Sequence, residues 1–120
     1  MKKIFITRKL LKPNEERISK IWDAKLNSED KVHSQNELIE LSRDCDGILC
    51  SIVDKFDAET INKLSDKVKI ISNFAVGFGN IDIKAAKKKN IIVTNTPGVL
   101  TDATAEIAIL LLLGAARRAT

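Results

Sequence analysis

The sequence is poor in several side chains that build common binding sites. Among 120 residues it has no tyrosine, four phenylalanines, one tryptophan and one histidine. Proteins that bind single-stranded nucleic acids stack bases on aromatic side chains, and this sequence offers no such platform. Its two cysteines, Cys45 and Cys50, have neither metal-site spacing nor the number needed for a disulfide framework. We therefore expect no metal, no nucleic-acid partner and a reducing, cytoplasmic location.

Long apolar runs are also lacking. The apolar run 4–6 near the N-terminus is too short for the core of a signal peptide. The longest apolar stretch, 107–113 extended through 116, is far shorter than the roughly 20 residues that span a membrane. Twenty Lys and Arg residues are interleaved with 16 Asp and Glu residues, so we interpret the net charge of +4 as a solvated mixed surface. A soluble protein without a membrane partner is expected.

What is present is an alternation of short apolar runs and helix-like segments. The composition, 44% hydrophobic and 30% charged, is that of one compact globular domain. Five runs are predicted strands: 4–6, 23–26, 47–50, 68–71 and 91–93. Because helices separate these runs, the strands should be parallel. The sequence therefore predicts an α/β fold, a flavodoxin-like doubly wound parallel five-stranded sheet of order 2-1-3-4-5, with a C-terminal apolar helix.

Local signals mark where the helices begin and end. Proline fits a first helical turn, Ser, Asp and Thr can cap an N-terminus, and Asn suits a C-terminus. The start and end residues predicted on this basis are Pro13, Ser34, Asp57, Asn80, Asn90 and Thr101. Ser34 is followed by Glu37 at the spacing of a capping box. The last helix is apolar on all sides over 107–113, so it should have partners on every side.

Ligands of doubly wound sheets bind beyond the carboxyl ends of the strands. This directs attention to the loops that follow Cys50, Asn73 and Asn95. The second loop contains Gly77 and Gly79, which we expect to adopt conformations that other residues resist and to let an anion approach backbone N–H groups beside a helix N-terminus. The loop lacks the third glycine of a dinucleotide fingerprint, and the pair alone would equally suit a tight turn.

Further motifs decide between these interpretations. Residues 73–82, the pair Ala85-Ala86, residues 92–106 and residues 115–118 closely resemble the D-isomer-specific 2-hydroxyacid dehydrogenases, most of all the glyoxylate and hydroxypyruvate reductases. The resemblance implies a substrate-binding (catalytic) domain at 1–100 and an interdomain and dimerisation helix at 101–120. It also implies that the Rossmann NAD-binding domain of the family is absent from this chain.

The resemblance assigns substrate-binding roles by position. The backbone N–H groups that match Val76 and Gly77 hold the substrate carboxylate in the family, and Ala75 adjoins them. The loop that matches Cys50 and Ser51 lines the pocket. These five residues are the predicted substrate site.

The resemblance also places two residues near the cofactor, Leu100 and Thr104. The cofactor is NAD or NADP in the intact enzyme, and none is expected for this chain alone. Hydride transfer needs a proton donor and a carbonyl-polarising cation, and the family takes its catalytic Arg, Glu and His from parts that this chain does not match. His33 is expected at the surface, and Glu106 is expected to be stabilised by the helix dipole near the start of its helix. Neither matches the catalytic His or Glu of the family, so we predict no catalytic residue in this chain.

Two functions stay open at this point. The chain is either the substrate-binding domain of an NAD(P)H-dependent reductase of small 2-oxoacids, glyoxylate or hydroxypyruvate, or a catalytically inactive, self-associating carboxylate-binding module. Both are expected to form a homodimer through the helix 101–118. A phosphoacceptor receiver domain shares the strand rhythm but needs paired acids where Thr7 and Arg8 stand. The sequence distinguishes neither glyoxylate from hydroxypyruvate nor NADH from NADPH.

Overall fold

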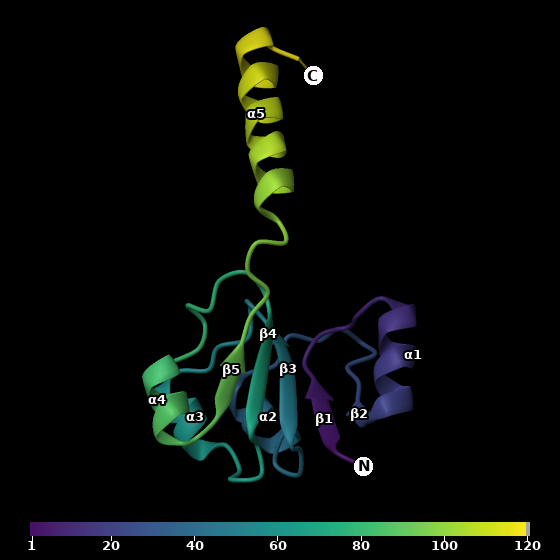
Figure 1. Cartoon of the computed structure of the whole chain (residues 1–120), viewed down its shortest axis with the longest axis vertical. Coiled ribbons are helices and arrows are strands. Elements are labelled where there is room, and N and C mark those ends of the chain that lie inside the picture. Colours follow the sequence, from purple (N-terminus) through teal and green to yellow (C-terminus); the bar gives the residue numbers. More distant parts are fainter. Residues whose placement is uncertain (120) are drawn as a thin grey trace.

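The computed structural model describes residues 1–119 and has the predicted α/β architecture (Figure 1). A single sheet has the strand order β2-β1-β3-β4-β5, and every neighbouring pair is parallel. The elements in chain order are β1 (Lys3–Ile6), α1 (Lys12–Ile21), β2 (Asp23–Lys25), α2 (Gln35–Leu41), β3 (Gly47–Ser51), α3 (Ala58–Lys63), β4 (Ile70–Phe74), α4 (Ile83–Lys88), β5 (Ile92–Thr94) and α5 (Thr101–Arg117). The predicted fold class and strand order are confirmed.

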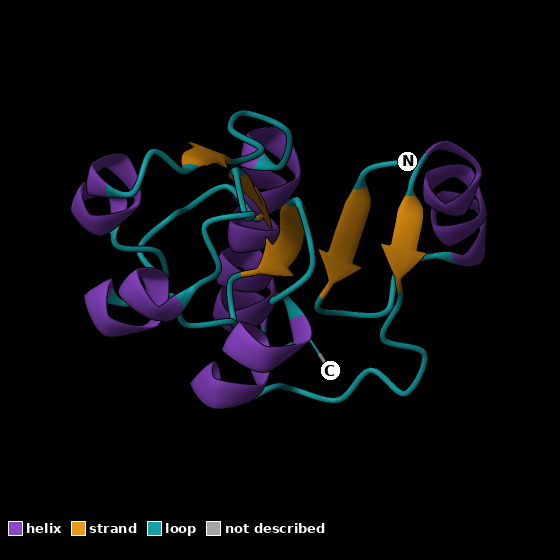
Figure 2. Cartoon of the chain, turned by 90° about the horizontal axis from the view of Figure 1, so that it is seen from below, coloured by secondary structure: helices purple, strands orange, loops and turns teal. Residues whose placement is uncertain are grey.

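The hydrophobic core lies on one face of the sheet. Successive side chains of a strand point to opposite faces, so Phe5, Ile48 and Ile71 share the face that packs on α2, α3 and α4, and each is at most 2% exposed. Figure 2 shows these three helices gathered on one side of the sheet and α1 beside β2 at the sheet's edge. The core therefore fixes β3 and β4, whose carboxyl ends carry two of the three loops of interest.

Most predicted helix ends are confirmed, and two of them, Ser34 and Asp57, are confirmed by side-chain hydrogen bonds. Ser34 and Glu37 form the complete capping box of α2, in which the Ser34 hydroxyl accepts from the Glu37 backbone N–H. Asp57 caps α3 by accepting from the backbone N–H of Thr60 at 2.9 Å. Asn90 has a left-handed backbone with a φ of 56°, which ends α4 as expected of asparagine. These ends were predictable because each cap involves residues close in sequence.

Two predicted helix starts are wrong. α4 begins at Ile83, not near Asn80, and its cap is Asp82, which accepts from the Ala85 backbone N–H. Thr101 is the first residue of α5 rather than its cap; the cap position is held by Leu100, with no side-chain hydrogen bond. The fourth strand is also displaced, to 70–74 instead of 68–71.

Helix α5 stands apart from the rest of the molecule (Figure 1). It has no buried residue, and the five large aliphatic side chains from Ile109 to Leu113 are 58–69% exposed. The radius of gyration is 17.1 Å, against roughly 13–14 Å for a compact domain of this length. The apolar character predicted for this helix is therefore present, and its surface is free to contact other molecules.

Candidate functional site

The loop 75–80 follows β4 at the carboxyl edge of the sheet, where Asn73 of β4, Asn95 after β5 and Asn80 of the loop itself bring their side chains. Asn73 is 1% exposed near the end of β4. Its Nδ2 donates to the Gly77 carbonyl at 2.9 Å and to Oδ1 of Asn80 at 3.0 Å. A single buried amide therefore fixes both the middle and the end of the loop.

Asn80 connects this loop to the loop that follows β3. Its Nδ2 donates to the Ser51 carbonyl at 3.1 Å and to the Asp54 carbonyl at 2.9 Å. The backbone N–H of Phe56 donates to the Asn80 carbonyl at 2.8 Å. The two loops that the sequence analysis assigned to the substrate site are thus joined through one side chain.

The segment after β5 supports the same loop from a third side. Nδ2 of Asn95 donates to the Val76 carbonyl at 2.7 Å, and the backbone N–H of Thr96 donates to the Ala75 carbonyl at 2.9 Å. With the carbonyls of Ala75, Val76 and Gly77 all accepting, the peptide planes of the loop have fixed orientations. The carboxyl ends of β3, β4 and β5 therefore cooperate to shape one loop.

The backbone N–H groups of Val76 and Gly77 have no acceptor among residues 1–119. Val76 is 41% exposed and no atom lies within 4 Å of a Cβ built on Gly77. Unpaired N–H groups held in fixed directions favour an anion that can accept both hydrogen bonds. The described structure therefore leaves the N–H groups of Val76 and Gly77 available to an acceptor from outside residues 1–119.

Two expectations that the sequence raised for this loop are wrong, the backbone conformation of its glycines and its position at a helix N-terminus. Gly77 and Gly79 do not adopt the left-handed conformation that favours glycine; the glycine that does is Gly98, with a φ of 75°. Nor does the loop lie at a helix N-terminus, because α4 starts only at Ile83. What Gly77 and Gly79 provide is open space over the backbone, since nothing lies within 4 Å of a Cβ at either position.

Cys50 and Ser51 are placed beneath this loop rather than on its exposed side. The Cys50 thiol is 2% exposed and donates to Oδ1 of Asn73 at 3.4 Å. Burial, with a smaller contribution from the Asp54 charge, raises the pKa of the Cys50 thiol to about 12. The exposed side chains of the loop after β3 include the apolar Ile52 and Val53, each 53% exposed.

A buried carboxylate supports Ser51. Oδ2 of Asp54 accepts from the Ser51 backbone N–H at 2.9 Å, from the Ser51 hydroxyl at 3.2 Å and from the Thr7 hydroxyl at 2.6 Å. Asp54 is 0% exposed. It ties the loop after β3 to the end of β1. The sequence analysis missed Asp54, Asn80 and the supporting role of Asn73, although asparagine at the ends of two adjacent strands was a usable signal.

The two predicted cofactor residues lie elsewhere, at the start of α5. Leu100 is 55% exposed, and its carbonyl accepts from the Thr104 backbone N–H at 2.9 Å. Both residues face solvent, and among residues 1–119 neither shares a hydrogen bond with the loop 75–80. The structure therefore does not join them to the predicted substrate site.

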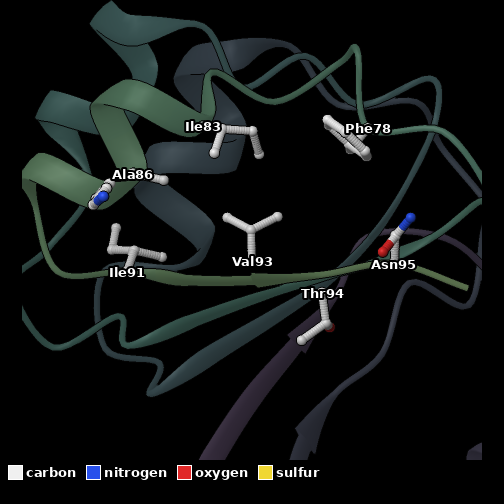
Figure 3. A pocket seen from close by; sticks show the side chains of 8 residues that line it. Phe78, Ile83, Ala86, Ile91, Val93, Thr94 and Asn95 are labelled. Carbon is white, nitrogen blue, oxygen red and sulfur yellow. The ribbon is translucent and has the colours of Figure 1, made fainter.

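A cavity of about 380 Å³ lies between α4 and β5. Figure 3 shows Ile83, Ile91 and Val93 turned toward this space and Phe78 and Asn95 at one end of it. Val76 and Gly77 do not line it. The cavity therefore adjoins the loop without containing the unpaired N–H groups.

The prediction that His33 lies at the surface is wrong. Both ring nitrogens are buried without a hydrogen-bond partner in the described part of the chain, and the ring centroid lies 5.6 Å from that of Phe5. Within residues 1–119 there is no cluster of three metal-ligating side chains. No helix in that range has the length and apolar character to cross a membrane.

Comparison with protein families identifies one matching model. The family of the D-isomer specific 2-hydroxyacid dehydrogenases, catalytic domain, matches residues 4–118. The glyoxylate reductase of Thermococcus litoralis is 44% identical over 116 residues, which are 97% of this chain and 35% of that enzyme. The glycerate dehydrogenase of Hyphomicrobium methylovorum is 39% identical and is covered to 37%. The chain thus spans about a third of the length of these relatives.

Solved structures agree with the sequence comparison. A D-isomer specific 2-hydroxyacid dehydrogenase from Polaromonas has a TM-score of 0.88 and 33% identity over 96% of this chain, which corresponds to 36% of that protein. The NADPH-dependent glyoxylate/hydroxypyruvate reductase of Sinorhizobium meliloti, solved with NADP and malonate, has a TM-score of 0.73 and 28% identity over 94% of this chain and 34% of its own. Sequence and fold therefore lead to the same set of enzymes.

Proposed function

The chain belongs to the family of D-isomer specific 2-hydroxyacid dehydrogenases, and from this membership we propose that it is the substrate-binding domain of an NAD(P)-dependent reductase. Its substrate would be a small 2-oxoacid of the glyoxylate or hydroxypyruvate type, reduced to the D-2-hydroxyacid by the intact enzyme. The site would consist of the loop 75–77, supported by Cys50 and Ser51 from the loop after β3.

One observation carries this proposal, the pair of unpaired backbone N–H groups at Val76 and Gly77. Every carbonyl from Ala75 to Gly77 is occupied by a donor from β4, β5 or the following segment, so the two N–H groups cannot rotate freely. A carboxylate that accepts from both would be fixed in orientation without reorganisation of the loop. A 2-oxoacid held in this way presents its carbonyl carbon at a defined position.

The part of the reaction that this chain performs is binding and orientation. The nicotinamide cofactor supplies the hydride when it is bound, and Leu100 and Thr104 are the residues here that would lie near it. The chain does not fit a dinucleotide on its own, because the sequence from Gly77 to Gly79 lacks the third glycine of a pyrophosphate-binding turn. The proton donor and the cation that polarises the carbonyl would come from the remainder of the intact enzyme.

The second candidate function is a catalytically inactive, self-associating carboxylate-binding module. The exposure of Ile109 to Leu113 on α5 favours it, because burying each large aliphatic side chain contributes about 1.5–3 kcal/mol. Both functions include a homodimer formed through α5 and a site for the carboxylate. They differ in whether the site serves a reduction in a longer enzyme.

A titration followed by backbone amide NMR tests carboxylate binding. Glycolate, a 2-hydroxyacid, should shift the amide signals of Val76 and Gly77 in a saturable way. Glycolamide, in which a neutral amide replaces the carboxylate, is the matched control and should leave both signals in place. Equal shifts with the two compounds, or shifts confined to other residues, would refute the proposed site.

An activity assay tests whether this chain alone can catalyse the reduction. The purified chain, checked for its mass of 13.3 kDa, should not oxidise NADH or NADPH in the presence of glyoxylate or hydroxypyruvate. Calorimetry should also detect no NAD binding, since the contacts to ribose and pyrophosphate would lie outside this domain. Turnover by the chain alone would show that it contains catalytic groups that we assign elsewhere.

A further inference from the structure

The peptide groups of the loop 75–77 show what orients its two unpaired N–H groups. A trans peptide group is planar and rigid, so its N–H and its C=O point in opposite directions. The Val76 N–H shares a peptide group with the Ala75 carbonyl, and the Gly77 N–H shares one with the Val76 carbonyl. A residue that holds one of these carbonyls therefore also sets the direction of the N–H at the other end of the same peptide group.

Two consecutive residues after β5 hold these two carbonyls. Nδ2 of Asn95 donates to the Val76 carbonyl at 2.7 Å. The backbone N–H of Thr96 donates to the Ala75 carbonyl at 2.9 Å. Figure 3 shows that the Asn95 side chain leaves its ribbon on the side of the loop that carries Phe78. The segment that begins at Asn95 is thus hydrogen-bonded to both peptide groups that present an N–H of the proposed site.

Asn73, the buried asparagine of β4, holds neither of these two peptide groups. Its Nδ2 donates to the Gly77 carbonyl at 2.9 Å. That carbonyl shares its peptide group with the N–H of Phe78. Asn73 therefore secures the loop through the next peptide group, whereas the Gly77 N–H is oriented from the side of β5.

The amide of Asn95 suits this role because an amide nitrogen donates and a carbonyl oxygen accepts. The nitrogen of Asn95, and not its oxygen, must therefore face the Val76 carbonyl. An anion that accepts from the Gly77 N–H would extend this bond into a chain that runs from the Asn95 amide through one peptide group to the anion. Hydrogen bonds in such a chain polarise and strengthen one another. Binding of an anion and the Asn95 hydrogen bond should therefore favour each other reciprocally.

We propose that Asn95 is a positioning residue of the carboxylate site, and that its amide orients and polarises the Gly77 N–H through the shared peptide group without touching the substrate. The backbone N–H of Thr96 does the same for the Val76 N–H. This inference rests on the proposed function and names the side chain on which the affinity of its site depends. The alternative is that Asn95 only fastens the segment after β5 to the loop.

The wild-type chain gives the first test, because a positioning residue should respond to a ligand that it does not contact. In a titration with glycolate followed by NMR, the side-chain amide signal of Asn95 should shift with the same dissociation constant as the backbone signals of Val76 and Gly77. Exchange of the Thr96 amide proton with solvent should slow as the site fills. Glycolamide, which has no carboxylate, should change none of these signals.

Two variants at the end of β5 give the second test. Asn95→Ala removes the donor and should raise the dissociation constant of glycolate about three- to tenfold, as expected when one hydrogen bond is lost. Thr94→Val is the matched control. It removes the 3.0 Å hydrogen bond from the Thr94 hydroxyl to the Ser72 hydroxyl and leaves the carbonyls of the loop 75–77 untouched, so it should bind glycolate as the wild type does. Both lost bonds are exposed, so both variants should keep the wild-type circular dichroism spectrum.

The outcomes separate this inference from the proposed function. Wild-type affinity in Asn95→Ala, or an Asn95 signal that does not respond while Val76 and Gly77 do, would overturn the positioning role and leave the proposed site in place. An equal loss of affinity in Thr94→Val would also contradict it, because the affinity would then depend on the general packing of β5. If glycolate shifts neither Val76 nor Gly77 in the wild-type chain, the proposed function itself fails and this inference fails with it.

Discussion

The side chains of Asn73 and Asn80 are hydrogen-bonded to each other, Nδ2 to Oδ1, at 3.0 Å. Asn73 belongs to β4, and Asn80 ends the loop that β4 leads into and reaches across to Ser51. This pair closes the loop across a separation of seven residues, and the N–H groups of Val76 and Gly77 within it have no acceptor among residues 1–119. The proposed carboxylate site therefore depends on side chains that would not touch the substrate.

Replacing Asn80 should destabilise the whole domain. Asn80→Asp keeps the size of the side chain but removes the two hydrogen bonds that Nδ2 donates to the Ser51 and Asp54 carbonyls. The Asp54 carbonyl would lose its donor and the Ser51 carbonyl would keep only the Asp54 backbone N–H. With a new carboxylate beside both, the free energy of unfolding should fall by about 2–4 kcal/mol. Urea denaturation measures this change. Asn36→Asp, an exposed position on α2, should change it little, and equal losses in both variants would contradict the role of Asn80.

Neither cysteine should react while the protein is folded. Cys50 is 2% exposed with a pKa raised to about 12, and Cys45 is fully buried with a raised pKa, in both cases mainly through burial. At pH 8 the thiolate fraction of Cys50 is about one in ten thousand, and the thiolate is the reactive form. A chromogenic disulfide reagent should therefore label neither thiol in buffer and both in concentrated urea. Rapid labelling of the folded chain would show that the core beneath the site opens.

Acid should weaken the start of α2. Lys31 and the Ser34 backbone N–H hold the pKa of Glu37 at about 2, below its ordinary 4.5. Because the folded-state pKa is depressed, the stabilising effect is complete above about pH 4.5 and is lost as the pH falls toward 2. Glu37→Gln should therefore lower the melting temperature at pH 7 and leave it unchanged near pH 2. Glu40→Gln, on the exposed side of α2, should behave as the wild type at both pH values.

The strand order and most helix ends could be predicted because their signals are local. The alternation of apolar runs with helical segments gives the parallel sheet, and Ser34 and Asp57 cap helices through residues three positions away. The predicted start of α4 was wrong because the Asn80 side chain does not cap the helix. It donates instead to the carbonyls of Asp54 and Ser51, which lie 26 and 29 positions earlier in the sequence. Contacts of that range follow from the assembled sheet and are not visible in a sequence window.

The sequence could name the backbone positions of the proposed site, but it did not reveal the side chains that support them. The positions of Val76 and Gly77 came from the family resemblance, whereas the burial of Cys50 and the Asp54 carboxylate under Ser51 came only from the structure. His33 was misplaced for the same reason, since a polar sequence neighbourhood does not reveal that the ring packs against Phe5. Sequence patterns predict which face of a helix or strand is buried. Which individual polar side chains become buried depends on packing between elements that are distant in the sequence.

The measurement that tests the central claim most directly compares two substitutions of Gly77 in the glycolate titration. Gly77→Ala keeps the backbone N–H and adds a Cβ that meets nothing within 4 Å, so it should bind glycolate as the wild type does. Gly77→Pro removes the N–H itself, and binding should be lost. If Gly77→Pro still binds glycolate with wild-type affinity, the carboxylate is not held by this backbone donor, and the proposed substrate site is contradicted.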